Sequence, residues 1–427
     1  MRPGLPPRLA SVWVHELMST SAVAFRRRAA LLPKAAQTDE RLVERRVGLV
    51  WGMLFLNALT FSPGGPLHIP GAVGKGITQG ALIVAFIVAL SINRRLVIRP
   101  NVFLCMVTLL VVGVVITAMQ PQFFGTVFRT CRFALYVGTL WLLTPWWGRR
   151  DILLVRCHLK VLTVVLGSVM LGLFVFPGRA IGGGRLAGVI WPIAPTQVAH
   201  YAAVMTGLVV MMWLCGRLPS RITVIAVLFT LAILVLTHTR TALVGTMAGI
   251  VVGGLSLVVA KRRVRKLFAA AGVFAVIAIM TLSGFITTWL ARGEGTQQLT
   301  QLTGRTKVWT VLLNFRRTKF QEIFGFGLSN GSFNGLSIDS NWLASYQEQG
   351  LWGVIICALI LLFLLVAAYF APRGLNRALA LFLITYCLIA SFTEVGFTDA
   401  SAYLLDLTLA ASLIVPAVTE QRQSPEL

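Results

Sequence analysis

Long apolar segments recur along almost the whole of this 427-residue chain, and they leave few folds open to it. Each segment holds roughly 20 residues, the length that an α-helix needs to cross a bilayer. Of all residues, 57% are hydrophobic and 12% are charged, whereas about a quarter of the residues in a soluble domain are charged. The sequence shows no short alternating strands of the kind that build a membrane barrel. It therefore predicts an all-α polytopic membrane protein.

The apolar segments predict about 12 transmembrane helices inside one membrane domain, residues 47–418. A basic cytoplasmic tail at 1–46, expected to be partly disordered, precedes this domain, and a short cytoplasmic tail at 419–427 follows it. The predicted spans lie at 47–62, 76–93, 101–119, 125–146, 158–176, 195–215, 222–237, 242–260, 267–290, 351–371, 378–393 and 401–418.

Basic residues set the predicted orientation of these helices. Lys and Arg concentrate in the loops at one side, most densely in KRRVRK at 261–266. Cytoplasmic loops of membrane proteins carry such an excess, so both termini are predicted to be cytoplasmic. The same bias accounts for the net charge of +24 without nucleic acid as a partner.

One long polar segment, residues 291–350, is predicted to form a large extracytoplasmic loop that contains short helices. Irregular polar segments of this kind in a membrane protein commonly carry function. The chain shows no H-E-x-x-H, no D-x-D, no P-loop and no C-x-x-C pattern. We therefore expect neither a metal nor a cofactor.

Arginines at the edges of apolar segments need a physical reason, because charge near a bilayer costs free energy. Arg129 and Arg132 share one helix face and either reach the lipid headgroups or face a polar cavity. Arg185 lies in GGGRLAG, which is either a ligand-binding turn or an ordinary flexible loop. His238 and Arg240 lie in the short turn THTRT, as interfacial anchors or as binding groups.

Within the large loop, Arg305 opens a helical pattern that includes Trp309, with Thr303 as the expected N-cap. Asp339 precedes the next apolar helix and is either its N-cap or a general base. Arginine suits bidentate binding of phosphate. Arginines and a few carboxylates on one side of a membrane favour transfer of a group from a phosphate-linked donor.

Five segments resemble motifs of one known family. They are GR followed by Trp309, GFGLSNGSF, DSNWLASYQEQGLWG, GGRLAG and THTRTA. Their order and spacing over residues 125–400 resemble the O-antigen ligase and Wzy-type polysaccharide polymerase superfamily of bacterial membrane glycosyltransferases. Gly350 and Gly353 match the glycines of its Gly-x-x-Gly element. Ser340 matches the second position of the His-(Asn/Ser/Gln) pair that stands nine residues before that element.

The resemblance implies a GT-C-like, metal-independent enzyme at the outer face of the cytoplasmic membrane. Its donor would be a glycan on undecaprenyl diphosphate, and its acceptor a glycan or a lipid. Asp339 would act near the acceptor. The residues that would bind the diphosphate are Arg185, Arg240, Arg305, Arg129 and Arg132, and the supporting residues are His238, Trp309, Ser340, Glu348 and Glu394.

Asp339 stands where ligases of this family carry histidine, and an acid at this position resembles the polymerase-type members. The resemblance therefore favours a polymerase of lipid-linked repeat units, with membrane lipids around it and a flippase or chain-length regulator as partner. A ligase that moves a finished glycan is the alternative. A non-enzymatic flippase or transporter is the third reading, which the crowding of charges at one face disfavours.

Overall fold

A computed structural model describes residues 34–59, 70–119, 124–149, 152–181, 184–258, 264–266, 270, 305–329, 332–333 and 336–415. Contacts divide the chain into two compact units, residues 1–47 and 48–427, and the site described below lies within the second. The predicted span at 267–290 lies, except for residue 270, outside the described residues. So do the large loop up to residue 304 and the tail at 419–427.

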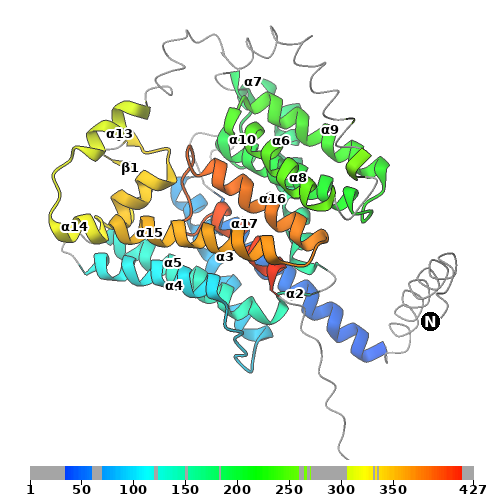
Figure 1. The fold of residues 1–427 in the computed structure, drawn as a ribbon, viewed down its shortest axis with the longest axis horizontal. Coiled ribbons are helices and arrows are strands. Elements are labelled where there is room, and N and C mark those ends of the chain that lie inside the picture. Colours follow the sequence, from blue (N-terminus) through cyan, green and yellow to red (C-terminus); the bar gives the residue numbers. More distant parts are fainter. Residues whose placement is uncertain are drawn as a thin grey trace, which may run out of the picture. The chain divides into compact units, whose positions relative to one another are not determined.

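The described part of the chain is mostly helical, as the apolar segments predict (Figure 1). A two-residue hairpin, β1 (Ser332–Phe333) with β2 (Leu336–Ser337), lies within the large loop. The helices are α2 (Lys34–Ala58), α3 (Gly71–Ile92), α4 (Val102–Ala118), α5 (Phe124–Leu143), the 3-10 turn η1 (Thr144–Trp146), α6 (Leu153–Val175), α7 (Pro177–Ala180), α8 (Pro195–Leu214), α9 (Ser220–Thr237), α10 (Arg240–Val258), α13 (Arg305–Leu313), α14 (Lys319–Phe324), α15 (Asn341–Phe370), α16 (Leu375–Ala390) and α17 (Ala402–Ile414).

Among the described residues, six helices are long and apolar enough to cross a membrane, namely α3, α6, α8, α9, α10 and α15. The helices α4, α16 and α17 are apolar but shorter. Described helices also overlap every other predicted span apart from 267–290. The helical membrane-protein class is thus supported, while the predicted number of crossings stays a prediction.

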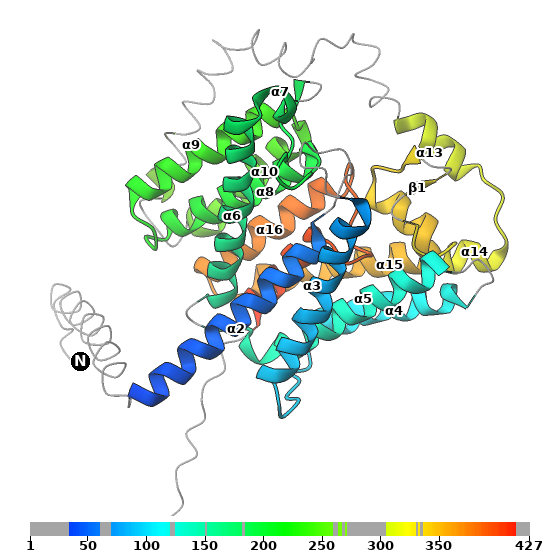
Figure 2. The same cartoon turned by 180° about the vertical axis from the view of Figure 1, so that it is seen from behind.

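Helix α8 forms the centre of the described bundle, where it contacts α6, α9, α10 and α16. Figure 2 shows α6, α8, α10 and α16 close together from behind. Small residues allow the closest of these approaches. A Cβ added to Gly249 of α10 would lie 2.8 Å from a ring atom of Phe382 on α16. The pairing of α10 with α16 therefore depends on glycine.

Helix α15 begins ten residues ahead of the predicted span at 351–371. Gly350, with φ +63° and ψ −157°, kinks the helix between a polar first half and an apolar second half. Asn341 and Gln349 in the first half are fully buried despite their polar side chains. Buried amides need hydrogen-bond partners, and the loops around this half of α15 provide them.

Candidate functional site

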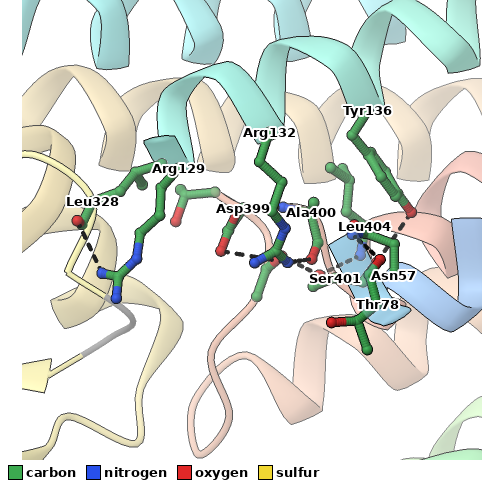
Figure 3. Close-up of polar contacts among 12 residues, drawn as sticks. Asn57, Thr78, Arg129, Arg132, Tyr136, Leu328, Asp399, Ala400, Ser401 and Leu404 are labelled. Carbon is green, nitrogen blue, oxygen red and sulfur yellow. Dashed lines mark hydrogen bonds and ion pairs between the residues drawn. The ribbon is translucent and has the colours of Figure 1, made fainter. Parts of the chain in front are cut away.

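The loop between α16 and α17, residues 391–401, is the meeting point of the polar groups around the predicted site. Side chains of α5, α10 and α15 each contact it. Figure 3 shows the α5 side of these contacts. We call residues 391–401 the hub loop. It was predicted only as an outer connection, TEVGFTDAS, between the last two spans.

The first half of α15 fixes the backbone of the hub loop. The Asn341 side-chain oxygen accepts hydrogen bonds from the backbone N–H groups of Gly396 (3.2 Å) and Phe397 (2.9 Å). The Gln349 side-chain NH₂ donates to the backbone oxygen of Thr398 at 3.2 Å. Because these amides are buried, their bonds to the loop satisfy groups that water cannot reach.

Arg129 and Arg132 both point from α5 toward loops, as their spacing on one helix face predicts (Figure 3). Arg132 donates to the backbone oxygen of Ala400 at 2.7 Å and lies 4.0 Å from the Asp399 carboxylate. Arg129 donates to the backbone oxygen of Leu328 at 3.1 Å. The two arginines therefore hold two different loops, and their binding of a diphosphate stays a prediction.

Glu348 is a buried carboxylate that holds the predicted Gly-x-Gly turn. Its Oε1 accepts from the backbone N–H of Ser329 at 2.7 Å and from the Ser329 hydroxyl at 3.1 Å. Gly325 and Gly350 both adopt a positive φ with ψ near 180°, a conformation almost restricted to glycine. A Cβ on Gly325 would lie 2.5 Å from the backbone nitrogen of Gln349. The two glycine motifs therefore place backbone directly against backbone.

Arg317 fixes the connection between α13 and α14, and the sequence analysis missed it. Its guanidinium donates to the Leu312 backbone oxygen at 3.2 Å and to the Gln347 side-chain oxygen at 2.9 Å. It also lies over the Tyr346 ring, 4.2 Å from the centroid. Burial lowers the pKa of Arg317, while nearby Tyr346 and Glu322 oppose that shift. These contacts fix the large loop onto α15.

Asp339 does not occupy the N-cap of the following helix, so that interpretation of its role is wrong. Ser340 occupies the cap of α15, and its side chain makes no capping hydrogen bond. Asp339 has a left-handed backbone, with φ +43°, and its carboxylate accepts a hydrogen bond from the Ser337 hydroxyl. The hairpin residue Ser337 thus helps to orient the carboxylate. Its role as a general base stays a prediction.

The helix α13 is fastened beside this turn, because Trp309 donates from Nε1 to the backbone oxygen of Ile338 at 2.8 Å. Ile338 is fully buried in an apolar cluster that includes Leu312, and Val395 of the hub loop packs against it. Arg305 is the first residue of α13, as predicted. Its side chain and the expected cap Thr303 lie outside what the structure describes.

Arg185 contacts the turn that carries His238 and Arg240. Its Nε donates to the Thr237 backbone oxygen at 3.0 Å, and one terminal nitrogen donates to the Thr239 hydroxyl at 3.1 Å. His238 adopts a left-handed backbone, φ +48°, which ends α9 and lets α10 begin at Arg240. Two elements of the family resemblance, distant in sequence, therefore meet in the fold.

A narrow crevice, too tight to admit a water molecule, lies beside this turn. Thr241 on its wall accepts a hydrogen bond from Thr393 of the hub loop at 2.9 Å, so the crevice adjoins that loop. Pockets that hold small molecules are far larger, at roughly 300–1,000 Å³. The residues that line it are Thr196, Thr239, Thr241, Ala242, Tyr386, Ala390, Glu394 and Tyr403.

Three titratable side chains that the sequence analysis missed meet in the bundle core. Asp406 of α17 lies between His158 of α6, with Nε2 at 3.1 Å, and His200 of α8, with Nε2 at 3.0 Å. All three are at most 2% exposed. Each Nε2 therefore lies within hydrogen-bonding distance of a carboxylate oxygen. We call these residues the Asp406 cluster.

A signal for this cluster was present in the sequence. Asp406 is the one carboxylate in the apolar segment 401–418, and ionisable residues inside such segments are rare and usually functional. His158 and His200 were weaker indications, because a single histidine in an apolar segment can equally be an ordinary core residue with one hydrogen bond.

No family model matches the chain, and no curated protein matches it. Within the described ranges, no group of three His, Cys, Asp or Glu side chains is arranged to hold a metal ion.

Proposed function

We propose that this protein is a membrane glycosyltransferase that joins oligosaccharide repeat units carried on undecaprenyl diphosphate. The product is an exopolysaccharide, a capsule or an O-antigen-like glycan. The observation that carries the proposal is the contact of Arg185 with the turn before Arg240. It brings together two arginine elements of the family resemblance, beside a crevice that carries a carboxylate, Glu394.

Further contacts support one continuous site. The crevice adjoins the hub loop through Thr241 and Thr393. The hub loop in turn packs through Val395 on the cluster around Ile338, next to Asp339. Arginines and a candidate base therefore belong to segments that contact one another. The closed crevice requires the loops to move apart before a lipid-linked sugar enters.

The proposed reaction breaks the bond between the donor sugar and its diphosphate and forms a bond to an acceptor hydroxyl. Arg185, Arg240 and Arg305 stabilise the diphosphate that leaves with the electron pair. A carboxylate, Asp339 in this proposal, takes the proton of the acceptor hydroxyl. The proposed placement has about 12 spans in a GT-C-like arrangement, with both termini cytoplasmic and the site on the outer face of the cytoplasmic membrane.

The proposal is tested by the size profile of lipid-linked glycans in cells that lack the protein, with and without complementation. Single repeat units should accumulate without long chains, and the wild-type gene should restore polymer. Long chains stranded on the carrier would instead indicate the ligase reaction. An unchanged profile would refute a role in either reaction.

Variants of the arginines assign the site. Arg185→Ala and Arg240→Ala should each abolish polymer while the protein still inserts into the membrane. Arg221→Ala is the matched control, because Arg221 is an exposed arginine at the start of α9, away from these contacts. Wild-type polymer in an Arg185 or Arg240 variant would remove that residue from the site. Asp339→Asn should retain the Ser337 contact and lose the basicity, and so lose activity.

A further inference from the structure

The Asp406 cluster continues on both sides into a chain of polar contacts through the bundle core. On one side, Trp51 donates from Nε1 to Nδ1 of His158 at 3.2 Å. On the other side, Nδ1 of His200 lies 3.1 Å from the Tyr386 hydroxyl. The order of groups is therefore Trp51, His158, Asp406, His200 and Tyr386. The contacts connect helices α2, α6, α17, α8 and α16.

The first histidine has a fixed protonation state. An indole N–H can only donate, so Nδ1 of His158 must accept and carries no proton. The proton of His158 then lies on Nε2, which faces Asp406. His158 is therefore a neutral donor to the carboxylate. A second proton would have to sit on Nδ1, where it would point at the Trp51 N–H and repel it.

The second histidine has no such restriction. A tyrosine hydroxyl can donate or accept, so Nδ1 of His200 fits Tyr386 with or without a proton. With a proton on both nitrogens, His200 becomes an imidazolium whose Nε2 faces the Asp406 carboxylate at 3.0 Å. The carboxylate compensates that charge in a place that water does not reach.

The two ends of the chain also differ in their ability to accept a proton. Trp51 is fully buried and cannot accept a proton, which closes that end. At the other end, Tyr386 lines the crevice beside Glu394. Tyr403 lines the same crevice, and its ring lies 4.0 Å from the His200 ring between centroids. Among the described contacts, the end of the chain that can accept a proton is therefore the Tyr386 hydroxyl on the crevice wall.

We propose that Tyr386, His200 and Asp406 form a proton-accepting relay that serves the crevice. A proton that arrives at the Tyr386 hydroxyl is taken up as the hydroxyl passes its own proton to Nδ1 of His200. The imidazolium is balanced by Asp406 and returns the proton along the same path. His158 is a positioning residue that orients the carboxylate.

The use of this relay in catalysis rests on the proposed function. Asp339 would take the proton of the acceptor hydroxyl while that oxygen bonds to the donor sugar, and the Tyr386 end of the relay would then receive the proton. The bond to the diphosphate breaks in the same step, and the electron pair leaves with the phosphate. The relay would thus hold one proton per transfer and release it before the next.

Other titratable groups near the relay belong to the helices around it. They are Tyr201 on α8 itself, Tyr136 on α5, Cys387 on α16 and Tyr403 on α17, with Glu394 in the hub loop. Within the described ranges, the ion pairs of Asp406 are with the two histidines. His200 is therefore a base that contacts both the Asp406 carboxylate and the Tyr386 hydroxyl on the crevice wall.

The test is solid-state NMR of the full-length protein in lipid bilayers, labelled with ¹⁵N-histidine. The chain has 5 histidines, and His158→Gln and His200→Gln assign the two signals of interest. Over roughly pH 5 to 9, His158 should stay the neutral Nε2–H tautomer, while His200 should convert to imidazolium as the pH falls. Tyr386→Phe, which removes the hydroxyl, should shift the pH midpoint of His200.

Tyr201→Phe is the matched control, because the Tyr201 ring lies 5.4 Å from the His200 ring without a hydroxyl contact to it. Its midpoint should equal that of the wild type. A His200 that stays neutral over the whole range would overturn the relay. So would equal shifts in the two tyrosine variants.

The same variants separate this inference from the proposed function. If His200 titrates as expected but cells lacking the protein have a normal glycan profile, the relay stands and the glycosyltransferase proposal fails. If polymer depends on the protein but His200 never protonates, the glycosyltransferase proposal stands and the relay fails.

Discussion

The hub loop and the Asp406 cluster use polar side chains in opposite ways. Around the hub loop, long side chains bond to backbone, as Arg132 does to the Ala400 oxygen and Asn341 to the Gly396 N–H. In the Asp406 cluster, side chains contact side chains, and all three belong to titratable residue types. The first region gives a loop its shape, whereas the second stores charge in an apolar core.

The difference shows why a charged residue near a membrane is a poor guide to its own role. The arginines most prominent in the sequence are engaged with backbone carbonyls, which they can bind without any substrate. The carboxylate with the strongest physical constraint is Asp406, since burial of a charge is costly unless it is paired. The position of a charged side chain, and not the number of charges, therefore indicates whether that side chain holds a loop or is a buried titratable group.

Asp406→Ala should have the largest effect on stability. It leaves the two imidazole N–H groups of His158 and His200 buried without an acceptor, at a cost of about 4 kcal/mol in the free energy of unfolding. Asp399→Ala is the matched control, because its pair with Arg132 is about one-fifth exposed and should contribute at most about 1 kcal/mol. Unfolding in mixed detergent micelles measures both. Equal losses would contradict the contrast between the two regions.

Gly350→Ala should have the next largest effect, about 3 kcal/mol. A Cβ there would lie 2.5 Å from the backbone of Ile323, and the backbone conformation is nearly restricted to glycine. The control is Gly80→Ala in α3, where an added Cβ meets nothing within 4 Å. That control should be neutral or slightly stabilising. If both variants melted alike, the close backbone approach at the kink would be disproved.

Asn341→Ala should cost about 2 kcal/mol, because the N–H groups of Gly396 and Phe397 lose their acceptor in a buried place. Hydrogen exchange should become faster at these two amides first. Asn341→Asp keeps an oxygen at the same position and should preserve more of their protection. Unchanged exchange in the alanine variant would show that the hub loop holds its shape without α15.

Arg132→Lys should have the smallest effect, within about 1 kcal/mol. Lysine keeps the charge near Asp399 but loses the guanidinium that donates to the Ala400 oxygen. Hydrogen exchange across 399–401 should rise locally while the melting temperature changes little. A large loss of global stability would mean that Arg132 belongs to a cooperative core and not to the hub loop.

Part of the fold follows from local sequence. Segments such as 195–215 and 222–237 predict α8 and α9 within a few residues, because a long apolar run can satisfy its backbone in a bilayer only as a helix. The shared face of Arg129 and Arg132 follows from helix periodicity alone. The start of α15 was predicted to within one residue, because Asp339 was expected as a cap of the helix that leads into the span at 351–371, and the helix begins at Asn341.

The candidate site was predicted only as separate pieces. The glycines of GFG and QGLWG were noted, but only the structure shows that they lie backbone against backbone. Asp339 was interpreted as either an N-cap or a general base, and the cap belongs to Ser340, a difference of one residue that local sequence cannot resolve.

The sequence by itself determined that this protein is helical and apolar, and where most of its helices lie. It also identified the glycines and arginines that an apolar transmembrane helix does not require. These properties depend on neighbours along the chain, since periodicity and run length are local. Only the tertiary structure decided that His158 and His200 meet Asp406, and that Arg185 meets the turn before Arg240. Such contacts join residues far apart in sequence, and their geometry depends on how helices pack, which no local pattern records.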